Sequence, residues 1–141
     1  MDLFVKEKRS RAGIVSHDIP LISNLNVRNN ISLILQYHRN MPAKKAGKFV
    51  DECLERLGIP LVADKRISTL STEENFLTML LRAAMMEDAI LVLDRPFSIL
   101  TNITEDYFIM DTLEKIDDLF KEAYIFDCIW RKLRYRRLDG A

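Results

Sequence analysis

The stretch of the sequence best suited to chemistry is a short run around residue 94. Four apolar residues, Ile90 to Leu93, lead directly into Asp94, and Arg95 follows at once. A carboxylate at the end of a buried strand can bind Mg²⁺, usually together with the phosphates of a substrate. A hydrolase with this layout needs a second carboxylate where Arg95 stands. The run is therefore a working nucleotide site, an inactive one, or a core strand that ends in a turn. In the last case, which we favour, Asp94 caps the turn or pairs with Arg95.

Three other polar residues are candidates for a site. Ser71 precedes Glu74 by three positions, a capping-box pattern, so we favour a helix cap over a nucleotide contact. His17 and His38 fall in different expected elements, and structural zinc needs four ligands. The sequence therefore favours surface histidines over a metal site.

Composition indicates one domain with no strong attraction to a polyanion. The chain has 141 residues, with 21 basic and 21 acidic side chains. Residues 6–11 and 131–137 are basic and residues 102–127 are acidic, so the basic ends either pair within the fold or contact an anionic partner. Cys53 and Cys128 lack CxxC spacing, which is typical of buried thiols in a reducing compartment. With no long apolar run, we expect a cytoplasmic location.

Apolar runs and helical periodicity alternate along the chain. Strands are expected at 12–18, 89–93 and 123–127, and helices at about 23–39, 42–57, 71–86 and 104–122. Asn24 or Asn26 can cap the first helix, Gly58 ends the second, and Thr104 or Asp106 can cap the last. Residues 132–138 form a last strand or a basic helix, and we favour the strand.

This alternation predicts an α/β fold with a small parallel sheet. We expect a single domain over 1–141, in which 27–86 form an α-helical subdomain and 9–18 with 87–141 form the sheet core.

An ordered series of motifs resembles the second half of the ATPase domain of ABC transporters. The sequence "IVSHDIPLISNLNVRNNI" (14–31) is similar to the family's Gln loop and the segment after it, and "STLSTEENFLTMLLRAAMMEDAILVLDRPFSIL" (68–100) follows the order of the signature, the Walker B strand and the D-loop. The resemblance covers about residues 9–128. It implies an incomplete P-loop NTPase-like fold, with Asp94 at the Mg²⁺ position and Ser71 at the signature position.

The same comparison shows which parts of the ATPase are missing. No GxxxxGK[ST] sequence occurs in the chain, and that loop provides most of the phosphate contacts. His17 stands at the position of the catalytic Gln, Arg95 at that of the catalytic Glu, and Cys128 near that of the switch His. Thr72 and Glu73 replace the two signature glycines. Because phosphoryl transfer needs these parts together, we expect no ATP hydrolysis by this chain alone, no catalytic residue, and no cofactor.

The resemblance also bears on partners. The family's strand order leaves the edge of the strand at 124–126 unpaired, so either residues 132–138 or a partner would cover it. We expect a homo-oligomer or a transporter subunit as partner, with peripheral membrane association through that partner. The resemblance places such a contact in the groove near residues 17–30 and on the helical lobe. The leading interpretation is a degenerate ATP-binding subunit that acts in protein interaction or regulation.

Two alternatives remain. The chain is a fragment of a full ABC ATPase that needs its P-loop half, or it is a module that binds nucleic acid or another anionic surface through Arg131, Lys132 and Arg134. The zero net charge argues against nucleic acid.

Overall fold

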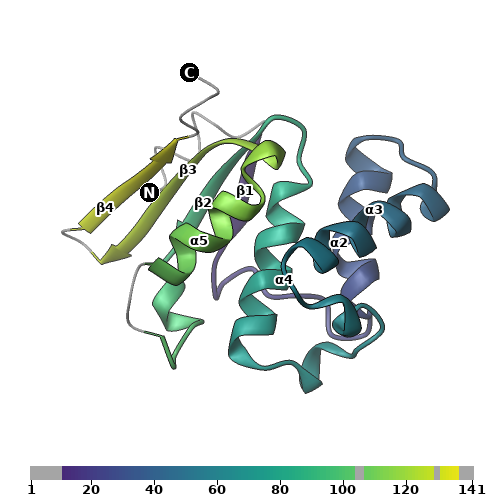
Figure 1. The fold of residues 1–141 in the computed structure, drawn as a ribbon, viewed down its shortest axis with the longest axis horizontal. Helices are drawn as coiled ribbons and strands as arrows, with labels where there is room; N and C mark the ends of the chain where they lie inside the picture. Colours follow the sequence, from purple (N-terminus) through teal and green to yellow (C-terminus); the bar gives the residue numbers. More distant parts are fainter. Residues whose placement is uncertain (1–10, 104–106, 129–130, 137–141) are drawn as a thin grey trace.

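The structure places a four-stranded sheet beside a lobe of helices (Figure 1). It is a computed structural model that describes residues 11–103, 107–128 and 131–136, with backbone alone for residues 128 and 131–136. The elements in chain order are β1 (Ala12–Val15), α2 (Val27–His38), α3 (Ala43–Arg56), α4 (Thr72–Ala84), β2 (Ala89–Asp94), α5 (Tyr107–Lys115), β3 (Phe120–Cys128) and β4 (Arg131–Arg136). Short 3-10 turns connect several of them.

The sheet has the order β1-β2-β3-β4. The pairs β1–β2 and β2–β3 are parallel and β3–β4 is antiparallel. The predicted α/β class with a small parallel sheet is therefore confirmed. Residues 131–136 form a strand and not a helix, and this strand covers the edge of β3.

Several predicted boundaries were wrong, since β1 ends at Val15 and not at residue 18, and α2 begins at Val27 and not at residue 23. We expected a helix continuing to Glu122, but α5 ends at Lys115 and β3 begins at Phe120. Pairing across the sheet decides the boundary, because Phe120 aligns with Ala89 at the start of β2. The proposed caps Thr104 and Asp106 lie outside the described residues.

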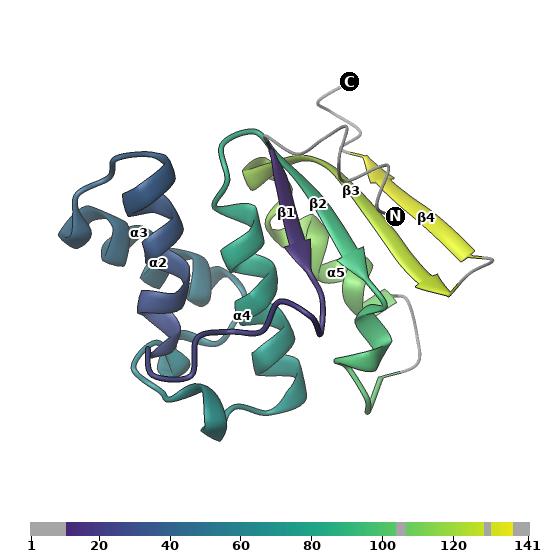
Figure 2. The same ribbon diagram turned by 180° about the vertical axis from the view of Figure 1, so that it is seen from behind.

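Both long helices that contact the sheet lie on the same face of it. Figure 2 shows the strands in front of α5 and α4 beside β1, whereas Figure 1 shows α5 in front of the strands. The rings of Phe76 in α4 and Phe108 in α5 lie 6.4 Å apart, so the two helices also contact each other. Residues at alternate positions of the strands join this core, namely Leu91, Leu93, Ala123 and Ile125.

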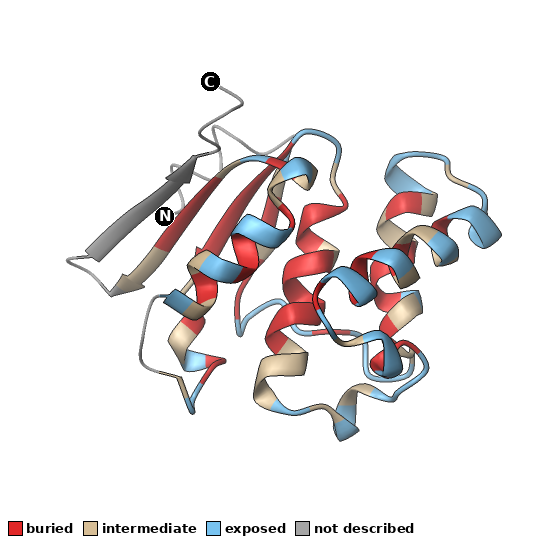
Figure 3. Cartoon of the chain, in the orientation of Figure 1, coloured by how far each residue is buried: buried red, intermediate tan, exposed pale blue. Residues whose placement is uncertain are grey.

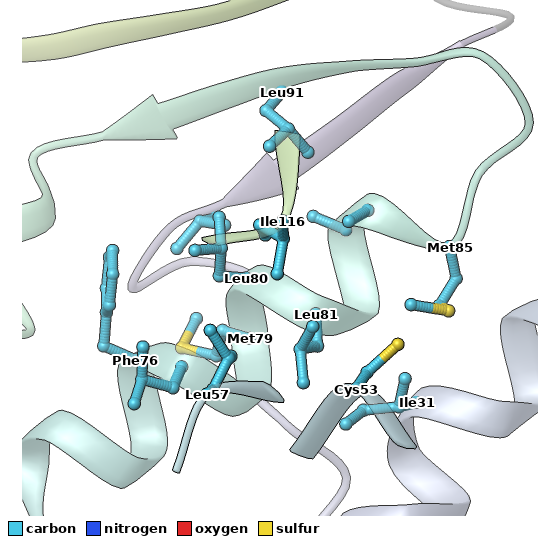
Figure 4. Packing of buried hydrophobic residues seen from close by; sticks show 14 of the residues in the cluster. Ile31, Cys53, Leu57, Phe76, Met79, Leu80, Leu81, Met85, Leu91 and Ile116 are labelled. Atoms are coloured by element: carbon cyan, nitrogen blue, oxygen red, sulfur yellow. The ribbon is translucent and has the colours of Figure 1, made fainter. Parts of the chain in front are cut away.

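Helix α4 connects the sheet to the helical lobe. Figure 4 shows Leu80 on the side of α4 toward Leu91 and Ile116, and Leu81 on the side toward Ile31 and Cys53. All of these side chains are at most 1% exposed. Burial in Figure 3 follows the same division, because α4 is largely buried and the outer sides of α2 and α3 are exposed. Met79 and Met85 are both buried, and Met86 is partly buried against the same core.

Local sequence signals fix three helix ends. Asn26 accepts a hydrogen bond from the backbone N–H of Asn29, and so caps α2. Ser71 and Glu74 form both hydrogen bonds of a capping box at α4. Gly58, with φ of 78°, ends the segment that follows α3 in the left-handed region that glycine tolerates. Each of these ends was predicted.

The packing of β1 on α4 depends on a glycine. A Cβ at Gly13 would lie 2.1 Å from the carbonyl oxygen of Ala83. Only a residue without a side chain therefore allows β1 and α4 to approach this closely. The proposed division into a helical subdomain over 27–86 and a sheet core over the remainder stays a prediction.

Candidate functional site

Asp94 lies at the carboxyl end of β2, as predicted, and its side chain is mostly buried. Its Oδ2 accepts a hydrogen bond of 3.1 Å from the hydroxyl of Ser16, at the end of β1. Parallel strands bring these two residues together although they are 78 positions apart in sequence. One carboxylate oxygen of Asp94 is therefore already hydrogen-bonded to another side chain of the chain.

Arg95 is the second partner of Asp94. Its Nε lies 3.3 Å from Oδ1 of Asp94, and its Nη2 lies 3.5 Å from Oδ2. The same guanidinium is 3.5 Å from Oδ2 of Asp18. Arg95 has φ of 49°, and its backbone N–H donates to the carbonyl of Phe126 in β3. The predicted pairing of Asp94 with Arg95 is confirmed, and a cation sits between two carboxylates.

His17 joins this group through the turn after β2. Its Nε2 lies 2.6 Å from the carbonyl oxygen of Ser98, to which a protonated Nε2 donates. Ser98 in turn donates from its hydroxyl to the carbonyl of Arg95. The structure therefore brings together Ser16, His17, Asp18, Asp94 and Arg95, which we call the acidic-strand site.

The other residues predicted from the sequence for a site are not among those that the hydrogen bonds and ion pairs join to the acidic-strand site. Ser71 and Glu74 bond to each other at the start of α4, which satisfies the capping interpretation. The hydroxyl oxygen of Thr72, at the signature position, is buried without a hydrogen-bond partner. Cys128 ends β3, and its side chain lies outside the described part of the structure.

The segment between β1 and α2 holds a second feature, which the sequence did not reveal. Two side chains from different helices bind its backbone. The guanidinium of Arg82 in α4 donates to the carbonyl oxygens of Ile19 at 2.6 Å and Pro20 at 2.9 Å. The side chain of Asn30 in α2 accepts from the N–H of Ile22 at 2.7 Å and donates to its carbonyl at 3.0 Å. Residues 16–22 form a loop that is thereby held at its middle and at its C-terminal end, which we call the bridging loop.

Burial accounts for the electrostatics of Arg82. Its side chain is partly buried against the bridging loop, and this loss of hydration lowers the pKa of the guanidinium. The charge persists at neutral pH, because arginine titrates far above it. Both hydrogen bonds to the loop are therefore charge-assisted.

An apolar groove of about 490 Å³ runs beside the bridging loop. Its walls come from β1, the bridging loop, the outer face of α2 and the end of α4. Three large apolar side chains in it are exposed to solvent, Ile19 at 42%, Ile22 at 46% and Tyr37 at 79%. A sequence signal did exist, since Ile19 and Ile22 flank Pro20 outside any strand, but only the folded chain places Tyr37 beside them.

The comparisons with known proteins identify the chain's family. The sequence model of the ABC transporter family matches residues 4–98, more than half of the chain. The chain belongs to the ABC transporter family. Its parallel strands and packed helices are part of a P-loop NTPase-like domain.

Individual relatives within this family are ATP-binding proteins of importers and other transport systems. The glutamate transport ATP-binding protein GluA of Corynebacterium glutamicum is 27% identical over 129 residues, which cover 92% of this chain and 52% of GluA. The molybdenum import ATP-binding protein ModC of Brucella melitensis is 33% identical over 112 residues, 79% of this chain and 30% of ModC. The ribose import ATP-binding protein RbsA of Clostridium perfringens is 27% identical over 108 residues. The chain thus spans about half the length of GluA and less of the other two.

ABC ATPases normally use ATP with Mg²⁺, so the fit of the acidic-strand site to a metal can be tested. The described residues contain no cluster of three or more metal-ligating side chains. Asp94 is the single carboxylate at the expected position, and the guanidinium of Arg95 already lies against both of its oxygens. A divalent cation there would have to displace Arg95 and then be repelled by it. The residues present do not fit a bound Mg²⁺.

The length and apolar character of the helices bear on whether the chain can cross a membrane. Among the helices of the described ranges 11–103 and 107–128, none has the length and apolar character needed to cross a bilayer.

Proposed function

We propose that this chain is a degenerate ABC ATP-binding subunit that does not hydrolyse ATP by itself and acts by docking on a membrane-embedded transporter subunit. The observation that carries the proposal is the apolar groove with its three exposed side chains, Ile19, Ile22 and Tyr37. Exposed apolar side chains gathered around a groove are typical of a protein-binding site. The relatives GluA and ModC are named as transport and import ATP-binding proteins, which indicates the class of partner.

The shape of the groove suits a helix of the partner. An amphipathic helix binds by placing apolar side chains at i, i+3, i+4 and i+7 into a hydrophobic groove. The groove is lined on one side by α2, through Leu33, Ile34 and Tyr37, and on the other by Ile19 and Ile22 of the bridging loop. Apolar side chains therefore face the occupant from both walls.

The inactive part of the proposal rests on the acidic-strand site. Asp94 is neutralised by Arg95, and the sequence lacks the P-loop that would bind phosphates. A catalytic role needs a free carboxylate there and a general base beside it. We therefore expect no ATPase activity above background in purified protein, with or without Mg²⁺. Magnesium-dependent hydrolysis that Asp94→Ala abolishes would refute this expectation.

Calorimetry separates weak nucleotide binding from none. With ATP as titrant, in the presence and absence of Mg²⁺, we expect binding weaker than about 1 mM, which corresponds to roughly 4 kcal/mol. Micromolar affinity that depends on Asp94 would instead favour a nucleotide-regulated role.

The docking site can be tested by crosslinking in cells. A photo-crosslinking amino acid replaces Tyr37 in the groove and, as a matched control, Leu61, which is 88% exposed and does not line the groove. We expect a crosslink from position 37 to the membrane subunit of a transporter, and none from position 61. Equal crosslinks from both positions, or crosslinks only to soluble proteins, would refute the docking proposal.

The pairing of β4 with β3 bears on whether a second copy or a separate P-loop half could add a strand to the sheet. Because β4 pairs with β3, a strand from a second copy or from a separate P-loop half could join β3 only by displacing β4. The prediction of self-association depended on an unpaired edge of β3, and β4 covers that edge. The groove is therefore the better candidate for an interaction surface.

A further inference from the structure

A group of cations surrounds the turn between α2 and α3. Arg39 lies in the turn, and Lys44, Lys45 and Lys48 lie in the first half of α3, all exposed. His38 and Tyr37 precede them at the end of α2, and both are exposed as well. We call this set of six residues the basic corner. Figures 1 and 2 both place the first turn of α3 at the edge of the molecule farthest from the sheet.

The lysines of the basic corner form no ion pair among the described residues, although Arg39 lines a pocket that also contains Glu87, Asp88 and Asp118. None of the ion pairs formed by the described residues involves Arg39, Lys44, Lys45 or Lys48; those pairs use Arg28, Arg56, Arg95, Lys115 and Lys121. The first turn of α3 contains no acidic residue, so the positive end of the helix dipole adds to the same potential. Acidic side chains appear on α3 only from Asp51 onward. The corner therefore presents concentrated positive charge in a chain whose net charge is zero.

The position of Tyr37 favours a lipid surface over a nucleic acid. Tyr37 is 79% exposed beside these cations, and tyrosine is a preferred side chain at the boundary between headgroups and hydrocarbon. The corner offers a few cations on one helical hairpin, whereas binding to a nucleic acid usually needs many phosphate contacts. Tyr37 and His38 also line the apolar groove, so the corner and the groove meet along α2.

We propose that the basic corner binds the anionic headgroups of a membrane surface directly, without a partner protein. Lysines near an anionic bilayer each contribute about 1 kcal/mol, and this attraction is lost at high salt. Lys44 and Lys48 lie on the same face of α3, one turn apart, and Lys45 lies next to them, so all three can approach one plane. The inference goes beyond groove docking and rests on the charge of the corner together with the exposed ring of Tyr37.

Vesicle sedimentation tests the proposal. The full chain is mixed with vesicles of phosphatidylcholine alone, or of phosphatidylcholine and phosphatidylglycerol, at low and high NaCl. We expect binding only to the anionic vesicles at low salt. The triple variant Lys44→Gln, Lys45→Gln, Lys48→Gln should lower the partition coefficient roughly 100-fold, from about 1 kcal/mol per lysine. The matched control Arg131→Gln, Lys132→Gln, Arg134→Gln removes the same charge elsewhere and should leave it unchanged.

Other outcomes would overturn the proposal that the basic corner binds lipid headgroups, or would replace the lipid by another polyanion. Equal binding to both kinds of vesicle, or loss of binding in the control and not in the corner variant, would overturn the proposal. A salt-dependent shift of duplex DNA that the corner variant abolishes, without vesicle binding, would replace lipid by nucleic acid. The groove variant Ile22→Asp separates the two proposals, since it should abolish the crosslink from position 37 and leave vesicle binding intact. Circular dichroism verifies that each variant is folded.

Discussion

Substitution of Gly13 by alanine tests how closely β1 must approach α4. The new Cβ would lie 2.1 Å from the carbonyl oxygen of Ala83, 2.7 Å from its carbonyl carbon and 3.0 Å from its Cα. Close C–H···O contacts place carbon and oxygen about 3.3 Å apart, so the two elements must separate by roughly 1 Å. The obstacle is helix backbone, which cannot change rotamer to make room.

The expected cost follows from this overlap. Overpacking a core costs about 1–3 kcal/mol, and a clash between two backbones belongs at the upper end of that range. Alanine recovers at most about 1 kcal/mol through the lower entropy of the unfolded chain. We therefore expect Gly13→Ala to lower the free energy of unfolding by about 2 kcal/mol or more. Urea denaturation followed by circular dichroism measures it, with the midpoint shifted and the m-value unchanged.

A second glycine provides the control. Gly47 lies inside α3, where a Cβ would contact only the flexible side chain of Arg28, at 3.4 Å. We expect Gly47→Ala to stabilise the protein by about 0.5–1 kcal/mol, because alanine favours helix. The two substitutions add the same methyl group and should act in opposite directions. If Gly13→Ala is as stable as the wild type within about 0.5 kcal/mol, the close approach of β1 and α4 does not exist as described.

Three further predictions address the bridging loop, the α4 cap and the buried thiol. Arg82→Met should lower the free energy of unfolding by about 2 kcal/mol, since two charge-assisted hydrogen bonds are lost. The same substitution should accelerate amide hydrogen exchange at Ile22, and unchanged exchange would show that Arg82 does not hold the loop. Ser71→Ala should cost about 1 kcal/mol in thermal denaturation, and Ser71→Gly only a few tenths. Burial raises the pKa of Cys53 to about 11, so in a Cys128→Ser background the folded protein should resist iodoacetamide at pH 8 and react once unfolded in urea. Because the folded state holds this proton more tightly than the unfolded state, the thiol's contribution to stability is complete below about pH 9 and is lost as the pH rises toward 11.

Local chemistry made most of the secondary structure predictable. Asn26, Gly58 and the Ser71–Glu74 pair act through their immediate neighbours, so their patterns are visible in the sequence. The start of β3 was missed for the opposite reason. Leu119 and Phe120 continue the helical spacing of α5, and only pairing with β2, about 30 positions earlier, makes Phe120 the first residue of a strand.

The two halves of the candidate site differ in the same way. Asp94 and its neighbour Arg95 could be paired from the sequence, because they are adjacent. The hydrogen bonds from Arg82 to the bridging loop join positions that are 62 and 63 residues apart in sequence. Nothing near Arg82 in the sequence indicates these bonds. The groove was expected only as a region near residues 17–30, since its wall at Tyr37 depends on how α2 packs.

The parallel pairing of β1 with β2 sets the order in which the protein folds. Ser16 and Asp94 are separated by 78 positions, and closing a loop of that length costs about 4 kcal/mol in chain entropy beyond a constant. During synthesis at about 5–20 residues per second, β1 waits roughly 4–16 s before its partner strand emerges. The bridging loop and its two exposed isoleucines follow directly from β1, so the groove forms only once β2 is in place. A docking partner would therefore recognise chains in which β2 already holds β1 in the sheet, which makes the groove a reporter of that pairing.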